Sequence, residues 1–290
     1  MIIHVVDGTY ELFRHYYAVP PRQNSDGQEI AATTGVLRHL LNIVADGATH
    51  IGIAVDTVVE SFRNELYPLY KNGEGMDPDI KSQFPILEEG IETLGMKLCR
   101  MVNYEADDGM ASMAKVAAAD PDVERVMLNT PDKDLAQCVV RGRVLQVDRR
   151  NNKVLDHDDV IEKHGVPPES IPDYLALTGD TADGFPGLKG WGKKSASTVL
   201  ARYGTIDKIP LHAGQWDVTV RSSTRLAETL AENMEDAKLF KKLATLVADT
   251  PTIDSVSELE WQGPTKDFEA FCTFLGSKSL YERAQDVAPK

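Results

Sequence analysis

The sequence predicts an α/β fold whose central sheet is mostly parallel and is covered by helices on both faces. Short apolar runs rich in β-branched residues alternate with segments of helical periodicity. The runs are apolar throughout rather than alternately polar, which is typical of strands buried on both faces. The predicted strands are residues 2–6, 51–55, 98–102, 126–128 and 144–147.

The segments between these strands supply the predicted helices. Apolar residues at helical spacing between residues 36 and 44 mark one buried face, and residues 86–94 and 105–119 are also expected to be helical. Residues 62–84 have weak periodicity, several prolines and glycines and little apolar content, so we expect a mobile segment over the edge of the sheet. From about residue 166 onward, prolines and short turns separate further helices.

Composition indicates a globular protein with a sizeable core and reduced thiols. The chain has 290 residues, of which 42% are hydrophobic, and its three cysteines form no metal-binding or disulfide pattern. The first residues lack the basic region and the apolar length typical of a signal peptide, and no apolar stretch approaches the length that spans a membrane, so we expect a cytoplasmic protein. The net charge of -14 argues against nucleic acid at first sight, but part of it comes from one acidic set, so the distribution of charge matters more.

That acidic set consists of carboxylates in short segments that end or interrupt apolar runs. Asp7, Asp56 and Asp132 fall at the carboxyl ends of predicted strands, where ligands bind in sheets of this type. Carboxylates a few Å apart repel one another and stay ionised only around a cation, and oxygen-rich sites prefer Mg²⁺ or Mn²⁺. The pattern therefore predicts a metal-dependent enzyme acting on phosphates. The full set is Asp7, Asp56, Glu105, Asp107, Asp108, Asp132, Asp134, Asp180 and Asp183.

Each acid taken alone has a simpler explanation. A single Asp at a strand end is more often a helix N-cap than a metal ligand, and acids at the start of residues 105–119 also complement the helix dipole. The remaining acids could be turn or loop residues. The whole set, with three members at strand ends, is harder to explain by capping.

A second motif is the glycine-rich stretch 187–196. It follows no predicted strand, which argues against a dinucleotide-binding fingerprint, and it lies between two helical stretches. Glycines let the backbone approach an ion or phosphate closely, and the following helix start favours anions. The alternative is a plain helical hairpin with a solvated charged face. The candidate DNA-binding residues here are Gly187, Lys189, Gly190, Gly192, Lys193 and Lys194.

Three further cations are candidates for phosphate contact, although each alone is more often a surface residue. Arg14 follows Asp7 by two helical turns and can lie near the same edge of the sheet. Arg63 and Lys71 lie in the segment 62–84, from which Lys71 could reach a phosphate from above.

At these residues the chain resembles the 5′ nuclease family, which includes flap endonucleases and the 5′ nuclease domain of bacterial DNA polymerase I. The opening motif is Val6-Asp7-Gly8, and the second is Val55-Asp56 with Arg63 and Lys71 following. The strongest motifs are residues 104–108 and 130–135, and residues 177–196 resemble the helix–three-turn–helix element. The match runs in order from residue 1 to about 210, and the chain ends where a polymerase would begin, so we expect a stand-alone member.

The resemblance implies the organisation of the molecule. It implies an α/β nuclease core at residues 1–165 with a helical arch at about 62–90. A helical DNA-binding region at 166–290 would carry the helix–three-turn–helix at about 171–204. The implied partner is DNA with a 5′ flap, a nick or a free 5′ end, with an RNA primer on DNA as a further substrate. We expect a monomer in a bacterial-type cytosol, associated with the nucleoid and not with a membrane.

The resemblance also implies two divalent metal ions, Mg²⁺ or Mn²⁺, and a K⁺ in the glycine-rich hairpin. One metal would be held by residues matching Asp7, Asp56, Glu105 and Asp107. The other would be held by residues matching Asp132, Asp134, Asp180 and Asp183, with Asp132 between the two. Asp108 would be a near or outer ligand, and Arg14 and Lys71 would stabilise charge on the phosphate that is cut.

The chain departs from the family pattern at three positions. Gly184 stands where the family usually has Asn, Trp191 stands where it usually has an aliphatic residue, and Glu74 follows Lys71 where another basic residue is usual. Other functions remain open: a DNA-structure-binding protein with weak catalysis, or a ribonuclease acting on RNA–DNA hybrids. A nucleotide-binding regulator is disfavoured, because the chain has no strand–Gly-loop–helix phosphate motif.

Overall fold

The computed structural model describes residues 1–289, and the chain folds into two compact units, each with its own hydrophobic core. Unit 1 consists of Met1–Val59, Gly73–Thr130 and Val247–Lys290, and unit 2 of Glu60–Asn72 and Pro131–Leu246. Each unit is therefore built from segments that are distant in the sequence. The predicted division at residue 165 stays a prediction.

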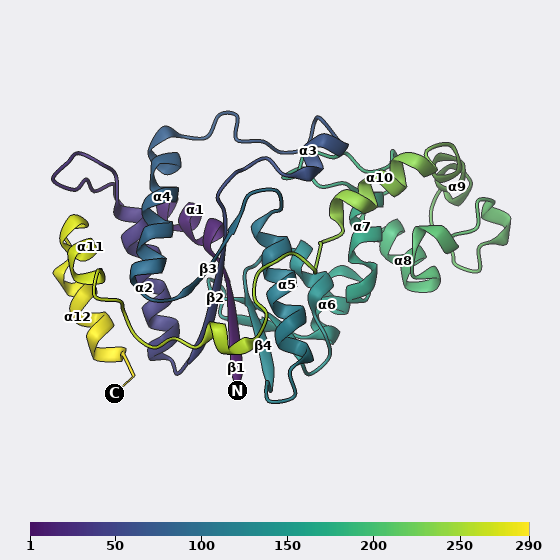
Figure 1. The fold of residues 1–290 in the computed structure, drawn as a ribbon. Helices are drawn as coiled ribbons and strands as arrows, with labels where there is room; N and C mark the ends of the chain where they lie inside the picture. The colour runs from purple at the N-terminus through teal and green to yellow at the C-terminus, as the bar shows by residue number, and fades with distance from the viewer. Residues whose placement is uncertain (290) are drawn as a thin grey trace. The chain divides into compact units, whose positions relative to one another are not determined.

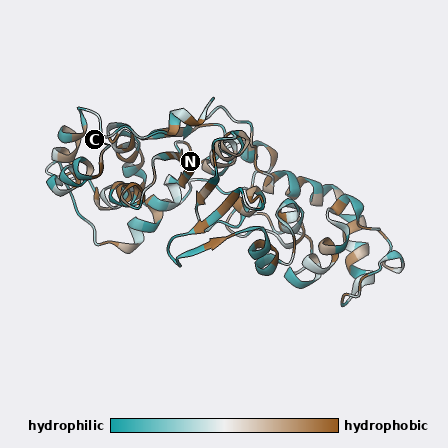
Figure 2. Ribbon diagram, turned by 90° about the horizontal axis from the view of Figure 1, so that it is seen from below, coloured by the Kyte–Doolittle hydropathy of each residue, from teal (hydrophilic) through white to brown (hydrophobic). Residues whose placement is uncertain are grey.

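Unit 1 contains a parallel sheet of four strands in the order β3-β2-β1-β4 (Figure 1). Ile3, Val5 and Val6 of β1 are fully buried, whereas Ile2 at the start of the strand is exposed, and strands are mostly brown in Figure 2, as expected for a sheet covered on both faces. Parallel pairing places Asp7 opposite Ala54, so the strand-terminal Asp7 and Asp56 lie at the same edge. The strands are β1 (Ile2–Asp7), β2 (His50–Asp56), β3 (Lys97–Met101) and β4 (Arg125–Asn129).

Helices cover both faces of this sheet, as predicted. Helix α5 packs on β1, β2 and β4, whereas α1, α2 and α4 lie on the other side, with α11 and α12 outside them (Figure 1). The helices of unit 1 are α1 (Gly8–Ala18), α2 (Ala31–Ala45), α4 (Pro78–Thr93), α5 (Ala106–Ala119), α11 (Phe268–Phe274) and α12 (Lys278–Val287), with the short 3-10 helix η5 (Val256–Leu259). The predicted α/β class with a mostly parallel sheet is confirmed.

Unit 2 is mainly helical, and its strands β5 (Val144–Asp148) and β6 (Lys153–Leu155) pair antiparallel. Helices α7 (Ile171–Thr178) and α8 (Lys193–Tyr203) enclose the glycine-rich stretch and share one core with α10 (Met234–Ala244). This is the helical arrangement expected for the second half of the chain. The other elements are α3 (Phe62–Leu66), η1 (Asp134–Cys138), α6 (His157–His164), η2 (Pro168–Ser170), η3 (Ile206–Lys208), η4 (Ala213–Gln215) and α9 (Ser223–Glu232).

Residues 62–84, predicted as a mobile segment over the edge of the sheet, contain more helix than their weak periodicity indicates. Helix α3 occupies their start, and α4 begins at Pro78, well before the predicted residue 86. The Asp77 side chain caps α4 by accepting the Asp79 N–H at 2.9 Å, and Pro78 stands at the first helical position, where its missing N–H has no consequence. Within residues 1–289, no helix is both long and apolar enough to cross a bilayer.

Candidate active site

In unit 1, the carboxylates at the ends of β1 and β2 are held by hydrogen bonds that also start the next elements. Asp7 accepts the Tyr10 N–H at 2.8 Å, which caps α1, and its other oxygen accepts the Thr130 hydroxyl at 3.1 Å. Asp56 accepts the Ala106 N–H at 2.7 Å, which fixes the start of α5 at the end of β2. Both carboxylates thus act as caps, and these caps also orient them at one edge of the sheet.

The acids at the start of α5 occupy different environments. Glu105 is the buried N-cap residue, Asp107 is half-buried, and Asp108 is fully buried. Asp108 accepts the Glu105 N–H at 3.0 Å and the Val247 N–H at 2.8 Å, one with each oxygen, so it braces the start of α5. The predicted ligand roles of these three residues stay predictions.

Unit 2 contains the tightest acidic cluster. Among the described residues, one set of three acids has ligand atoms that all lie within 4.8 Å of one another, and it consists of Asp134, Asp180 and Asp183. All three are buried, with 4 to 7% of each residue exposed. Asp132 is exposed, and its carboxylate accepts the Asp134 N–H at 2.9 Å. Three of the four acids predicted for one metal therefore lie close enough together to share an ion. Among the described residues, the acids of unit 1 do not form such a set of three.

The cluster is short of positive charge, although two lysines contact it. Lys133 forms an ion pair with Asp180, and Lys71 Nζ lies 2.9 Å from Asp183. Asp134 Oδ1 is buried and has no hydrogen-bond partner among residues 1–289, and Lys133 Nζ is 3.9 Å away. Burial, followed by the charges of Asp132 and Asp183, raises the pKa of Asp134 well above its ordinary value. A buried carboxylate oxygen without a partner, beside two other carboxylates, fits a divalent cation.

Lys133 is a site residue that was not among the residues predicted from the sequence. Burial acts to lower the pKa of its ammonium, but the carboxylates of Asp134 and Asp180 outweigh burial and raise it. The signal in the sequence was its place between Asp132 and Asp134, because a lysine flanked by two predicted metal ligands must itself lie near the site.

The loop that carries Asp180 and Asp183 explains why Gly184 departs from the family pattern. Its φ is +85°, and a Cβ at this position would lie 2.4 Å from the backbone oxygen of Leu69. Because Gly184 has no side chain, residues 69–71 can approach the loop. The backbone N–H of Lys71 then donates to the backbone oxygen of Asp183 at 3.0 Å. Gly184 thus permits the contact between Lys71 and the acidic cluster.

The glycine-rich stretch forms a tight connection between α7 and α8. Gly187 has a φ of +67°, and a Cβ there would meet the Gly179 nitrogen at 2.2 Å, so it is required by the turn itself. Gly190 and Gly192 are exposed. The three predicted cations are also exposed and form no ion pair with any described residue, which leaves them available to an anion: they are Lys189, Lys193 and Lys194.

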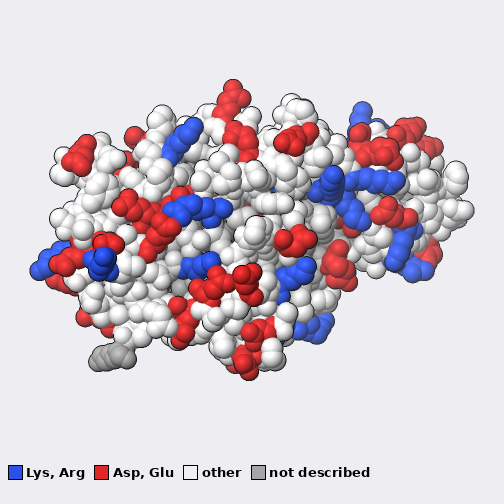
Figure 3. Space-filling model, in the orientation of Figure 1, with Lys and Arg blue, Asp and Glu red and all other residues white. Residues whose placement is uncertain are grey.

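Basic and acidic side chains are interspersed on the face of the molecule seen in Figure 3, despite the net charge of -14. Arg14 lies in α1, where its Nε donates to Glu11 at 2.9 Å, so this guanidinium is held by an acid of its own helix. Its predicted role toward a phosphate stays a prediction, as does that of Lys71.

The structure argues against the prediction that Arg63 binds DNA. Its side chain is buried, with only 1% of the residue exposed. Its Nε donates to the Leu243 oxygen at 2.8 Å and its Nη2 to the Thr245 oxygen at 3.1 Å. These carbonyls belong to the carboxyl end of α10, where backbone oxygens lack intrahelical partners. Arg63 is therefore a capping residue of α10, and its burial excludes contact with a phosphate in this conformation.

Carboxylates at the strand ends of a parallel sheet in unit 1, and a buried set of three Asp side chains in unit 2, are features of α/β proteins that bind metals and act on phosphates. Comparison with known proteins narrows this class. The family model of the 5′-3′ exonuclease N-terminal resolvase-like domain matches residues 2–165, and that of the 5′-3′ exonuclease C-terminal SAM fold matches residues 166–267.

Curated relatives agree with these matches. The chain is 32% identical to a 5′-3′ exonuclease of Aquifex aeolicus over 264 residues, which cover 90% of this chain and 87% of that protein. It is 35% identical to DNA polymerase I of Pseudomonas aeruginosa over 84% of this chain, but the match spans only 27% of the polymerase. The chain therefore belongs to the 5′-3′ exonuclease family, and the predicted 5′ nuclease resemblance is confirmed.

Solved structures show the same fold at low sequence identity. The bacteriophage T5 D15 protein co-crystallised with metal ions has a TM-score of 0.69 at 18% identity, with 98% of this chain and all of that chain covered. Flap endonuclease-1 from Methanococcus jannaschii has a TM-score of 0.62 at 15% identity, with 98% and 92% covered. The similarity of fold to these two structures therefore covers nearly the whole chain.

Proposed function

We propose that this protein is a structure-specific 5′ nuclease, which hydrolyses phosphodiester bonds near the 5′ end or flap of branched or duplex DNA. Family membership supports this activity, since the relative from Aquifex aeolicus is itself a 5′-3′ exonuclease. The single observation that carries the proposal is the buried triad of Asp134, Asp180 and Asp183 with its unpartnered oxygen. A DNA-binding protein without catalysis gains nothing from unneutralised carboxylates, because they repel phosphates.

The two acidic sets would hold divalent ions, Mg²⁺ or Mn²⁺. The triad and the exposed Asp132 would hold one ion, and four acids of unit 1 would hold the other: Asp7, Asp56, Glu105 and Asp107. When bound, such ions would supply an activated water and charge stabilisation for the leaving oxygen of a phosphodiester. The observation that supports the fit is chemical: all the donors are carboxylate oxygens, which hard cations prefer.

The cations of the chain would bind and orient the substrate. Lys71, held at Asp183 through a 2.9 Å ion pair, could shift from the carboxylate to a phosphate oxygen, and Arg14 could do so from Glu11. The exposed lysines of the hairpin would bind the duplex through its backbone, without reading the sequence. A K⁺ held by backbone oxygens of the hairpin is part of this proposal.

The proposed substrates are DNA with a 5′ flap, a nick or a free 5′ end, and an RNA primer paired with DNA. Terminal nucleotides must unpair to reach the acidic site, which costs a few kcal/mol and costs least at a flap or frayed end. We propose that the protein acts as a monomer in the cytosol, near the nucleoid where its substrate lies.

The decisive experiment compares labelled 5′-flap DNA, blunt duplex and RNA–DNA hybrid, each with Mg²⁺, with Mn²⁺ and with chelator. We expect metal-dependent cutting that is fastest at the flap. Asp132→Ala should abolish cutting while leaving binding measurable, whereas Asp122→Ala, the same change at an exposed turn, should leave cutting intact. Binding without metal-dependent cutting of any substrate would refute the nuclease and support a DNA-structure-binding protein. Cutting of the hybrid alone would support a ribonuclease.

A further inference from the structure

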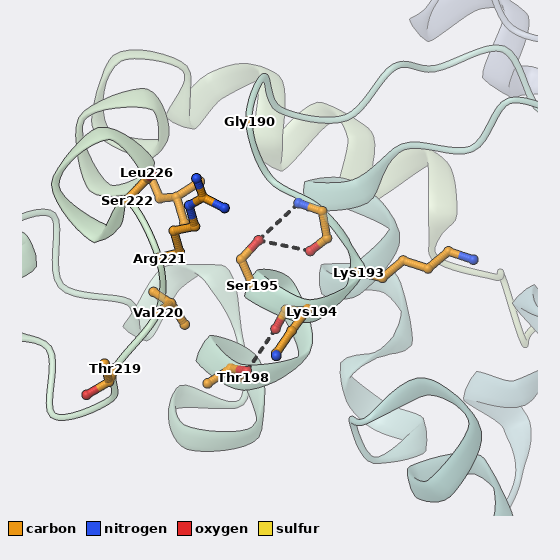
Figure 4. A pocket seen from close by; sticks show the side chains of 11 residues that line it. Gly190, Lys193, Lys194, Ser195, Thr198, Thr219, Val220, Arg221, Ser222 and Leu226 are labelled. Atoms are coloured by element: carbon orange, nitrogen blue, oxygen red, sulfur yellow. Dashed lines mark hydrogen bonds between the residues drawn. The ribbon is translucent and has the colours of Figure 1, made fainter.

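A pocket of about 710 Å³ in unit 2 adjoins the glycine-rich hairpin, and nearly half of its lining comes from outside the hairpin. One wall is formed by Gly190 and the first turns of α8, with Lys194 and Thr198. The other wall is formed by residues 219–222 and by Leu226 of α9 (Figure 4). No function assigned so far uses this second wall.

Trp191 joins the two walls. This residue is buried, and its indole N–H donates to the Leu226 backbone oxygen at 3.2 Å. Its ring also contacts the ring of Trp216, with 6.0 Å between the centroids. An aliphatic residue at this position would lack both the N–H donor and the ring. The family departure at Trp191 therefore has a structural consequence, because it fixes the second wall against the hairpin.

The charge of the pocket is uniformly positive. Its lining includes Lys193, Lys194 and Arg221 and no Asp or Glu. The three side chains are exposed and form no ion pair with any described residue, whereas Arg202 nearby is paired with Asp217. In Figure 4 the guanidinium of Arg221 reaches toward the hairpin from the second wall, opposite Lys194 on α8. The side chain of Lys193 extends away from the other two in Figure 4, so Arg221 and Lys194 are the pair that the pocket offers to a ligand. In a chain with a net charge of -14, two unpaired cations on opposite walls of one cavity indicate an anionic ligand.

We propose that Arg221 binds a backbone phosphate of duplex DNA in this pocket together with Lys194, and that Trp191 is the residue that positions it. The inference rests on the proposed nuclease function and extends it beyond the hairpin. The guanidinium offers a planar fork of donors that matches a phosphate, while Lys194 supplies a point charge from the opposite wall. The strand would thus be held from two sides, which fixes the register of the duplex without reading its sequence.

The test measures binding of fluorescent 5′-flap DNA in the presence of chelator, so that no strand is cut, between about 50 and 200 mM salt. Arg221→Gln should weaken binding roughly tenfold at low salt. It should also reduce the slope of log affinity against log salt concentration by about one. Arg225→Gln is the matched control, because Arg225 is also exposed and unpaired but does not line the pocket. Equal behaviour of the two variants would overturn the proposal.

The positioning role is tested by Trp191→Leu, alone and combined with Arg221→Gln. If Trp191 places Arg221, then Arg221→Gln should cause much less loss of affinity in the Trp191→Leu variant than in the wild type. If the losses of affinity in the two single variants add up in the double variant, Trp191 has no positioning role. If the Trp191→Leu variant does not fold, Arg221→Gln alone decides whether Arg221 binds the phosphate. A wild-type protein that neither binds nor cuts flap DNA would instead refute the proposed function itself.

Discussion

The replacement of Arg63 by Met separates a structural role from a DNA-binding role. The predicted DNA contact is inconsistent with a side chain that is 1% exposed and donates to two carbonyl oxygens at the end of α10. Met keeps most of the side-chain volume but offers no donor. The perturbation therefore removes the cap of α10 with little change in packing.

The expected loss of stability follows from these contacts. A hydrogen bond from a charged donor contributes roughly 1.5–3 kcal/mol, and Arg63 makes at least two. A cation at the carboxyl end of a helix adds about 0.3–2 kcal/mol through the helix dipole. Because burial of Met recovers part of this, we expect a net loss of about 4 kcal/mol, which is a large fraction of the usual stability of a domain.

Urea unfolding followed by tryptophan fluorescence measures this loss, since Trp191 and Trp216 both lie in unit 2. With a denaturant slope of about 3 kcal/mol per M, the midpoint should fall by more than about 1 M. Arg202→Met is the control, because Arg202 forms an exposed ion pair and its loss should leave the midpoint almost unchanged. An unchanged midpoint for Arg63→Met, together with a lower salt slope of DNA binding, would refute the capping role and restore the original prediction.

Three further outcomes follow from burial and backbone geometry. Asp134→Asn should raise the unfolding temperature of the metal-free protein at pH 8. The pKa of this buried carboxyl is raised in the folded state, so the folded state loses stability as the carboxyl ionises with rising pH, and Asn does not ionise. Added Mg²⁺ should raise the unfolding temperature of the wild type more than that of the variant. Burial lowers the pKa of His164 to about 4, so its NMR signals should not titrate between pH 5 and 8. Its contribution to stability is fully present above the ordinary value of 6.5 and should be lost progressively as the pH falls from 6.5 to about 4, because only the unfolded state takes up the proton in this window. Gly184→Asn should cost about 2 kcal/mol or more in urea unfolding because its Cβ would meet the Leu69 oxygen at 2.4 Å, whereas Gly142→Asn, at a φ of +67° with open space around it, should cost less; equal costs would contradict the close approach.

The sheet of unit 1 was predictable because its strands are buried on both faces, and such strands have uninterrupted apolar runs in the sequence. Each of the four parallel strands overlaps a predicted run, and the strand-terminal acids fall where the runs stop. The start of α4 was missed, although Asp77 and Pro78 are a recognisable cap and first helical residue. The weak periodicity and the prolines of this region concealed a helix that has Pro85 in its interior.

The identities of the acidic residues were predictable, but their partners were not. Strand ends and motif spacing indicate where Asp7 or Asp56 lies, because parallel strands deliver their ends to one edge. No local pattern indicates that Arg63 meets a carbonyl 180 residues later, at the end of α10. A cation in a polar segment resembles a surface residue, and only the packing of distant segments shows that it is buried.

Two departures from the family pattern become intelligible in the same way, since each is matched by a distant segment of unit 2. Gly184 leaves space for residues 69–71, and Lys71 in this segment pairs with Asp183 of the acidic triad. Trp191 donates a hydrogen bond to Leu226, and Arg221 in the preceding segment lines the pocket beside the hairpin. In both cases an unusual residue without charge determines where a cation lies. In the proposed phosphate-binding surface, backbone space and an indole hydrogen bond would therefore determine the electrostatics as much as the number of basic residues does. For that reason a net charge of -14 is compatible with binding DNA.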